Sequence, residues 1–179
     1  MHETGRVPSP TEVEDRLAIQ DVLACHSRGI DRADSDILKS AYWPDAIVFY
    51  GAFEGSAHTF CERMPDMMRG NRATHHAIGN VTIEFDGAVA RVETYVTAGH
   101  YIPGDDGDRE MTFFGRYLDR LERRGDVWKI VERRVVMDWN RLRPGSAHWH
   151  GALAKTLPHG TRDRGDPAYA HLEQRPHRP

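Results

Sequence analysis

The chain has 179 residues, of which 39% are hydrophobic and 28% are charged, a composition typical of a single soluble globular domain. Its formal net charge of −3, with Arg clusters interleaved with Glu and Asp, argues against a nucleic-acid partner. No apolar run approaches the ~20 residues of a membrane helix, and residues 1–10 lack the apolar core of a signal peptide. We therefore expect no membrane partner and a cytoplasmic location.

The first half of the sequence predicts helices, with one strand among them. We expect residues 1–10 to form a flexible tail, because Thr11 and Glu14 have capping-box spacing and begin the first periodic segment. Pro44 ends the second helical segment, and Pro65 is expected to kink the third. The predicted helices span 11–33, 35–42 and 56–68, and the apolar run 46–50 is typical of a buried strand.

The second half alternates between apolar and polar residues, as antiparallel strands do. Asp86 and Gly87 form a strong hairpin signal. Residues 143–179 are rich in Pro, Gly, His and Arg and predict an extended tail that packs on the domain or on a neighbouring subunit. Helices followed by a meandering sheet argue for one α+β domain over residues 11–142, with the helices on one face of a curved sheet. The predicted strands span 81–85, 89–102, 113–121 and 127–139.

Three polar residues occupy positions where periodicity predicts apolar surroundings. Asp31 is in helical phase with Val13 and Leu17, and a buried carboxylate must be paired or its pKa rises. His100 and Arg133 fall on the apolar faces of their strands. A buried guanidinium needs an anionic partner, which could be Asp31, a substrate oxygen or the carboxylate of a structural ion pair. His100 is likewise either a site residue or a hydrogen-bonded core histidine.

Two neighbouring histidines, His75 and His76, provide a further candidate, but alternation does not choose between them. Counting back from Val81 turns His75 inward. A β-bulge at Gly79 and Asn80 would turn His76 inward instead, and glycine often marks bulges.

Metal and covalent chemistry receive little support from the sequence. The chain has 11 histidines, but the pair formed by His148 and His150 lacks the spacing typical of zinc ligands. Cys25 and Cys61 are interpreted as reduced structural thiols, and no nucleophile elbow or phosphate-binding glycine motif is present. We therefore expect no metal and no nucleotide or other organic cofactor.

Four motifs, in this order and spacing, resemble a known family. They are residues 29–31 (GID), 74–80 (THHAIGN), 115–120 (GRYLDR) and 127–130 (VWKI). Over residues 11–142 the sequence resembles the SnoaL-like branch of the nuclear-transport-factor-2-like superfamily. The resemblance implies a cone-shaped α+β barrel, in which a strongly curved mixed or antiparallel sheet is closed by N-terminal helices around a deep apolar pocket.

Within that branch the sequence resembles the scytalone dehydratases and the hexachlorocyclohexane dehydrochlorinases, which use an Asp–His pair. The resemblance assigns this pair to Asp31 and His76. It also implies catalytic roles for His100 and Tyr50, which match pocket residues of the dehydratases, and for Arg133, which matches an arginine of the dehydrochlorinases.

The resemblance implies a pocket in which His26, Trp43, Val96 and Phe113 contact the substrate. His26 stands where the dehydrochlorinases have a lysine, which favours loss of water over loss of halide. The implied function is a cofactor-independent lyase of the dehydratase type, eliminating water from a hydrophobic aromatic or polycyclic molecule or releasing a small fragment by retro-aldol cleavage. An isomerase, a polyketide cyclase, a non-catalytic ligand-binding protein and a dioxygenase small subunit remain alternatives.

The last predicted strand suggests how copies of the chain assemble. Alternation places Trp128, Ile130 and Val136 on the outer face of the sheet among charged residues, and such a mixed face suits a subunit interface. Relatives in the family assemble through this sheet. We therefore expect a homo-oligomer, with a trimer favoured over a dimer.

Overall fold

One six-stranded sheet and four helices make up the fold in the computed structural model, which describes residues 5–173. The sheet order is β2-β1-β6-β5-β4-β3, with β1 and β6 parallel and all other neighbours antiparallel. The helices are α1 (Pro10–Asp31), α2 (Ser35–Ser40), α3 (Ala57–Arg69) and α4 (Pro167–Glu173). The strands are β1 (Tyr42–Tyr50), β2 (Phe53–Ser56), β3 (Ala73–Asp86), β4 (Val89–Ile102), β5 (Arg109–Arg124) and β6 (Val127–Pro144).

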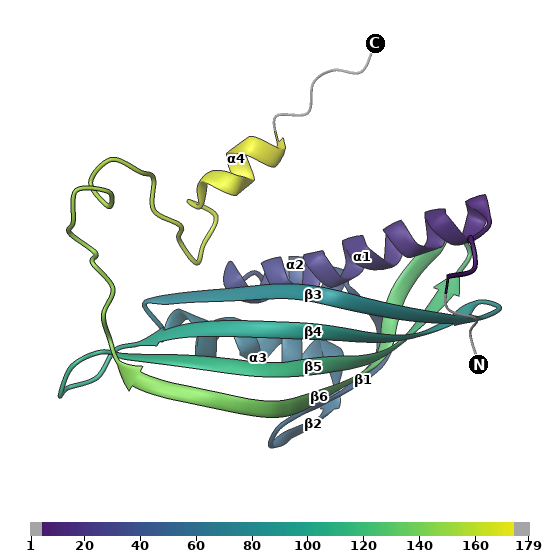
Figure 1. The fold of residues 1–179 in the computed structure, drawn as a ribbon, viewed down its shortest axis with the longest axis horizontal. Coiled ribbons are helices and arrows are strands. Elements are labelled where there is room, and N and C mark those ends of the chain that lie inside the picture. Colours follow the sequence, from purple (N-terminus) through teal and green to yellow (C-terminus); the bar gives the residue numbers. More distant parts are fainter. Residues whose placement is uncertain (1–4, 174–179) are drawn as a thin grey trace, which may run out of the picture.

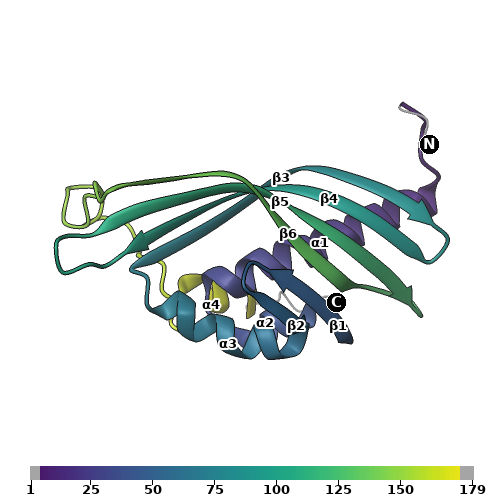
Figure 2. The same cartoon turned by 90° about the horizontal axis from the view of Figure 1, so that it is seen from below.

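The long strands β3 to β6 arch over the helices, and α1, α2 and α3 lie on the concave side of the sheet (Figures 1 and 2). This arrangement confirms the expected α+β cone with a strongly curved mixed sheet. The sheet is not closed into a barrel, because β2 and β3 form its two free edges. Among the described residues, no helix combines the length and the apolar character needed to cross a membrane.

The start of α1 and the position of Pro44 differ from the expectation, whereas Pro65 lies within its expected helix. Ser9, not Thr11, caps α1, its hydroxyl accepting a hydrogen bond from the Glu12 amide at 3.2 Å, and Pro10 takes the first helical turn, where its missing N–H costs little. Pro44 lies inside β1, beside an irregular register with β6. Pro65 lies inside α3, which continues to Arg69. The short elements β2 and α4 were not predicted.

Single-residue register shifts decide which side chains face the helices. Opposite Arg120 and Leu121, β6 carries one extra residue, Val131, so the inward residues change from even to odd numbers there. Trp128 and Ile130, expected on the outer face, therefore lie in the core at 3% and 0% exposure. The expected subunit interface on the outer face was therefore based in part on two residues, Trp128 and Ile130, that lie in the core.

Helix α1 packs through a different stripe from the one predicted. Val13 and Leu17, in phase with Asp31, are 42% and 57% exposed, whereas Ile19 and Leu23 are buried. The first half of the helix approaches the sheet through polar residues instead, since Asp15 accepts a hydrogen bond from the Trp128 indole. Asp31 is nevertheless buried, at the last residue of α1.

The chain after β6 returns to the helices and contacts its own α1–α2 junction. The Tyr169 hydroxyl donates to Asp34 at 2.6 Å, and Arg32 pairs with the buried carboxylate of Asp166. This part of the tail thus packs on the domain, whereas Leu153 is 71% exposed.

Candidate active site

An apolar cavity of about 550 Å³ lies between α3 and the inner face of the sheet. Residues from α3 form one wall, residues from all six strands form the other, and the end of α1 adds Ile30. The cavity is lined by Ile30, Tyr50, Ala52, Phe53, Phe60, Arg63, Met64, Met67, Met68, His76, Ala98, His100, Met111, Phe113, Tyr117 and Val135.

Asp31 and His76 meet at the edge of this cavity, although they are 45 residues apart in the chain. Asp31 Oδ1 is 2.7 Å from His76 Nδ1, and Asp31 Oδ2 accepts the backbone N–H of His76 at 2.8 Å. Each residue is 8% exposed. Two contacts to one carboxylate fix both the position and the orientation of the imidazole.

The protonation state of Asp31 follows from these contacts. Burial alone would raise the pKa of this carboxyl, but the hydrogen bonds and charge of His76 outweigh burial and hold its pKa below the ordinary value. Asp31 is therefore ionised at neutral pH and accepts the Nδ1–H of His76. In the neutral ring, Nε2 then carries a lone pair and is the nitrogen left for a ligand in the cavity.

A β-bulge selects His76 over its neighbour. The register of β3 on β4 shifts between Gly79 and Val81, and Asn80 adopts a positive φ of 49°. This extra residue reverses the alternation, so His76 lines the cavity whereas His75 is exposed.

His100 and Tyr50 add two further polar groups to the cavity wall. The rings of His76 and His100 are 5.4 Å apart and nearly perpendicular. Burial, helped by the neighbouring His76, lowers the pKa of His100 to about 4, so this ring is neutral at pH 7. Burial raises the pKa of the Tyr50 hydroxyl, which stays protonated and can donate a hydrogen bond. Both residues lie where a substrate oxygen could be bound.

Arg133 does not line the cavity, contrary to the expectation. Its guanidinium forms two hydrogen bonds of 2.7 Å with the Asp119 carboxylate, and both side chains are completely buried. It also stacks 4.0 Å from the centre of the Tyr117 ring. The buried charge is thus matched by a residue of the neighbouring strand β5, in the structural ion pair that the sequence had left open.

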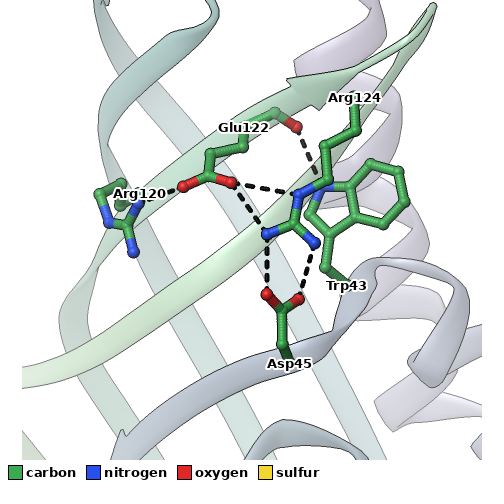
Figure 3. Close-up of polar contacts among 5 residues, drawn as sticks. All are labelled: Trp43, Asp45, Arg120, Glu122 and Arg124. Carbon is green, nitrogen blue, oxygen red and sulfur yellow. Dashed lines mark hydrogen bonds and ion pairs between the residues drawn. The ribbon is translucent and has the colours of Figure 1, made fainter.

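Trp43 is also not a pocket residue. Its indole N–H donates to the Glu122 backbone carbonyl at 3.0 Å, and the guanidinium of Arg124 lies 4.9 Å from the centre of the ring. Arg124 is held in turn by Asp45 and Glu122, in a network on the outside of the sheet (Figure 3). Trp43 follows Tyr42, which is buried, so alternation along β1 turns it outward.

His26 and Val96 lie behind the cavity rather than on its wall. His26 is fully buried, its Nδ1 lies 3.1 Å from the Tyr42 hydroxyl, and burial lowers its pKa well below the ordinary value. Val96 belongs to a small buried cluster with Ala98 and Tyr117, against which Tyr50 and Phe113 pack. Of the four expected substrate contacts, only Phe113 lines the cavity.

The sequence reasoning missed most of the α3 wall. Phe60, Met64, Met67 and Met68 recur at helical spacing on one side of the helix, a pattern that predicts a buried apolar face. Nothing in that pattern distinguishes a face that lines a cavity from one that packs against the sheet.

Within residues 5–173, no three His, Cys, Asp or Glu side chains converge in a way that could hold a metal ion. His148 and His150 lie in the tail, outside the cavity.

The curved sheet, its helical cover and its apolar cavity define a cone-shaped α+β protein with a buried Asp–His pair. A family model described as a SnoaL-like domain matches residues 11–134, and the chain belongs to this family, within the nuclear-transport-factor-2-like fold. It is 30% identical over 129 residues to the uncharacterized protein Rv2910c of Mycobacterium tuberculosis, covering 70% of this chain and 86% of the relative.

Solved structures of other proteins share the fold, among them the following two. One is the hexachlorocyclohexane dehydrochlorinase LinA-type3 of Novosphingobium barchaimii, with a TM-score of 0.68 and 20% identity, covering 76% of this chain and 94% of that chain. The other is a proposed scytalone dehydratase of Novosphingobium aromaticivorans, with a TM-score of 0.62 and 21% identity, covering 73% of this chain and 89% of that chain.

Proposed function

We propose that this protein is a cofactor-independent lyase of the dehydratase type that acts on a hydrophobic small molecule. The contact between Asp31 and His76, at the edge of a cavity whose other walls are mainly apolar, carries the proposal. Structural neighbours named as a dehydratase and a dehydrochlorinase support it, because both names denote eliminations.

In the proposed reaction, His76 Nε2 removes a proton from a carbon next to a carbonyl, and Asp31 stabilises the imidazolium that forms. The carbonyl oxygen, which becomes an enolate, accepts a hydrogen bond from Tyr50 or His100. The β-hydroxyl group leaves with its bonding electrons and takes the proton that the His76 imidazolium carries, so that a C–H and a C–O bond are replaced by C=C and water. Loss of a small fragment by retro-aldol cleavage uses the same groups, with His76 taking the hydroxyl proton.

The state of His100 favours an isomerase or cyclase as the second candidate. A ring with a pKa of about 4 is neutral at pH 7 and is better suited to stabilising an enolate than to protonating a leaving hydroxyl. Isomerisation and cyclisation need the enolate but not the leaving group.

An aryl β-hydroxy ketone tests the proposal, because dehydration gives an aryl enone and retro-aldol cleavage gives an aryl aldehyde. We expect His76→Ala to lower kcat by about 10²–10⁴-fold, the usual contribution of a general base. His75→Ala is the matched control, since His75 is exposed one residue away. Equal turnover in His76→Ala and the wild type would end the proposal.

The proposed assembly is a cytoplasmic homo-oligomer, a trimer ahead of a dimer, built from the domain of residues 11–142. The outer sheet face supports it, because Tyr95 and Trp139 are 49% and 52% exposed and Trp139 stacks on Phe114. Light scattering that reports a monomer at micromolar concentration would contradict this assembly.

A further inference from the structure

Within the described part of the chain, one lysine or arginine side chain, that of Arg63, lines the cavity, and it lies at the mouth. Among its lining residues, Ala52, Arg63 and Met67 are exposed to solvent, so they mark the opening. The Arg63 guanidinium lies 5.9 Å from the centre of the Phe53 ring, which also lines the cavity. Arg63 is therefore the one arginine or lysine that the cavity presents to a ligand, among the residues that the structure describes.

The neighbouring acids on α3 do not neutralise Arg63. Glu62 bonds Lys39 at 2.8 Å, and Asp66 bonds Arg69 at 2.5 Å. Within the described chain, Arg63 itself forms no ion pair within 4.0 Å. Its charge is thus available to a molecule that enters the cavity.

No acidic side chain lines the cavity within the described residues. Asp31 lies behind the His76 ring, and its two oxygens are occupied by His76. The remaining walls are methionines, aromatic rings and aliphatic groups, which bind an apolar body without selecting its charge. Only at the mouth does the cavity offer an ionic partner, and that partner is positive.

We infer that Arg63 is a specificity-determining residue and that the substrate class is a hydrophobic carboxylic acid. The apolar body lies against the methionines of α3, its reactive carbon reaches His76, and its carboxylate remains at the mouth. A guanidinium suits this role because its planar fork can hold both oxygens of a carboxylate. This inference rests on the proposed function, since it takes the same cavity as the substrate site.

Binding of naphthoate and of naphthamide, measured by calorimetry, tests the inference. The two probes share one apolar body and differ in charge. We expect the wild type to bind naphthoate about five- to tenfold more tightly, as for a partly exposed charge-assisted contact. Arg63→Gln should remove this preference, Arg63→Lys should keep part of it, and higher salt should reduce it in the wild type.

Arg69→Gln is the matched control, because Arg69 lies on the same helix outside the cavity and pairs with Asp66. It should keep the wild-type preference. Equal binding of the two probes by the wild type, binding of neither, or an unchanged preference in Arg63→Gln would overturn the inference. His76→Ala separates the two proposals, because it should keep the preference for naphthoate while losing turnover. If the protein prefers naphthoate but its turnover does not depend on His76, the inference about Arg63 stands and the proposed lyase function is wrong.

Discussion

Two buried acid–base pairs lie on the concave side of the sheet, and they differ in what they leave free. Asp119 and Arg133 make two parallel hydrogen bonds, are fully buried and do not touch the cavity through either charged group. Asp31 and His76 also approach to 2.7 Å, but only one ring nitrogen is used and the ring lines the cavity.

The difference shows how burial alone misleads a search for catalytic residues. Both pairs are buried, and an expected apolar environment is the feature by which the sequence singled out Asp31 and Arg133. A pair whose facing donors and acceptors satisfy one another contributes to structure. A pair that orients an unused lone pair toward an apolar cavity can also perform chemistry.

The largest effect on stability should come from breaking the pair formed by Asp119 and Arg133. Arg133→Met leaves the Asp119 carboxylate buried without a partner, which should lower the free energy of unfolding by about 3–5 kcal/mol. Urea denaturation measures this change. The double variant Arg133→Met, Asp119→Leu should recover much of the loss, because it removes both charges together. A loss below about 1 kcal/mol, the usual contribution of an exposed ion pair, would show that this pair does not stabilise the packing of β5 and β6.

The next largest effect on stability concerns His100, whose ring lies beside that of His76. Its folded-state pKa of about 4 lies below the unfolded value of about 6.5, so the unfolded chain binds more protons between these values. The stability that this neutral ring contributes is therefore complete above pH 6.5 and is lost as the pH falls toward 4, by about 2–3 kcal/mol. Fully buried His26 adds to the same trend.

Urea denaturation across pH 4–7 checks this prediction. His100→Gln should flatten the dependence, whereas His75→Gln should leave it unchanged, since His75 is exposed. A dependence that is identical in the wild type and in His100→Gln would mean that His100 titrates normally.

A smaller effect is expected outside the sheet, at Trp43. Trp43→Ala removes one hydrogen bond to Glu122 and the contact with Arg124, and should cost about 1 kcal/mol of stability. Turnover should not change, because the side chain points away from the cavity. A tenfold fall in kcat/KM at unchanged stability would show that Trp43 contributes to the substrate pocket after all.

No effect is expected from chelation. The proposed reaction takes its proton transfers from His76 and its hydrogen bonds to the enolate from Tyr50 or His100, so exhaustive treatment with EDTA should leave the rate of the aryl ketone reaction unchanged. Loss of activity that zinc restores would show that the histidines bind a metal.

The sequence predicted individual elements better than it predicted faces. β4 was placed at its observed bounds, Val89–Ile102, because Asp86 and Gly87 mark its beginning and its alternation is uninterrupted. Extra residues at Asn80 and Val131 reverse the alternation in β3 and β6. Gly79 permitted the first bulge without requiring it, and no glycine marks the second, so alternation alone could not choose His76 or bury Trp128.

The contacts between distant segments required the three-dimensional structure. Asp119 faces Arg133 because β5 and β6 pair in that register, and the α3 wall of the cavity depends on how that helix crosses the sheet. The sequence pattern of a single segment predicts neither the pairing of Asp119 with Arg133 nor the position of α3 on the sheet. The meeting of Asp31 with His76 came from the family resemblance rather than from periodicity.

Asp31→Asn, compared with Asp119→Asn, tests most directly whether the pair formed by Asp31 and His76 is the catalytic one. In Asp31→Asn the amide oxygen should keep the backbone N–H of His76, which turns the NH₂ group toward Nδ1. The proton of the ring then moves to Nε2, which can no longer accept one. The account predicts that kcat falls by about 10²–10⁴-fold in folded Asp31→Asn, whereas Asp119→Asn loses stability but keeps the kcat of its folded fraction. A wild-type kcat in Asp31→Asn would contradict it.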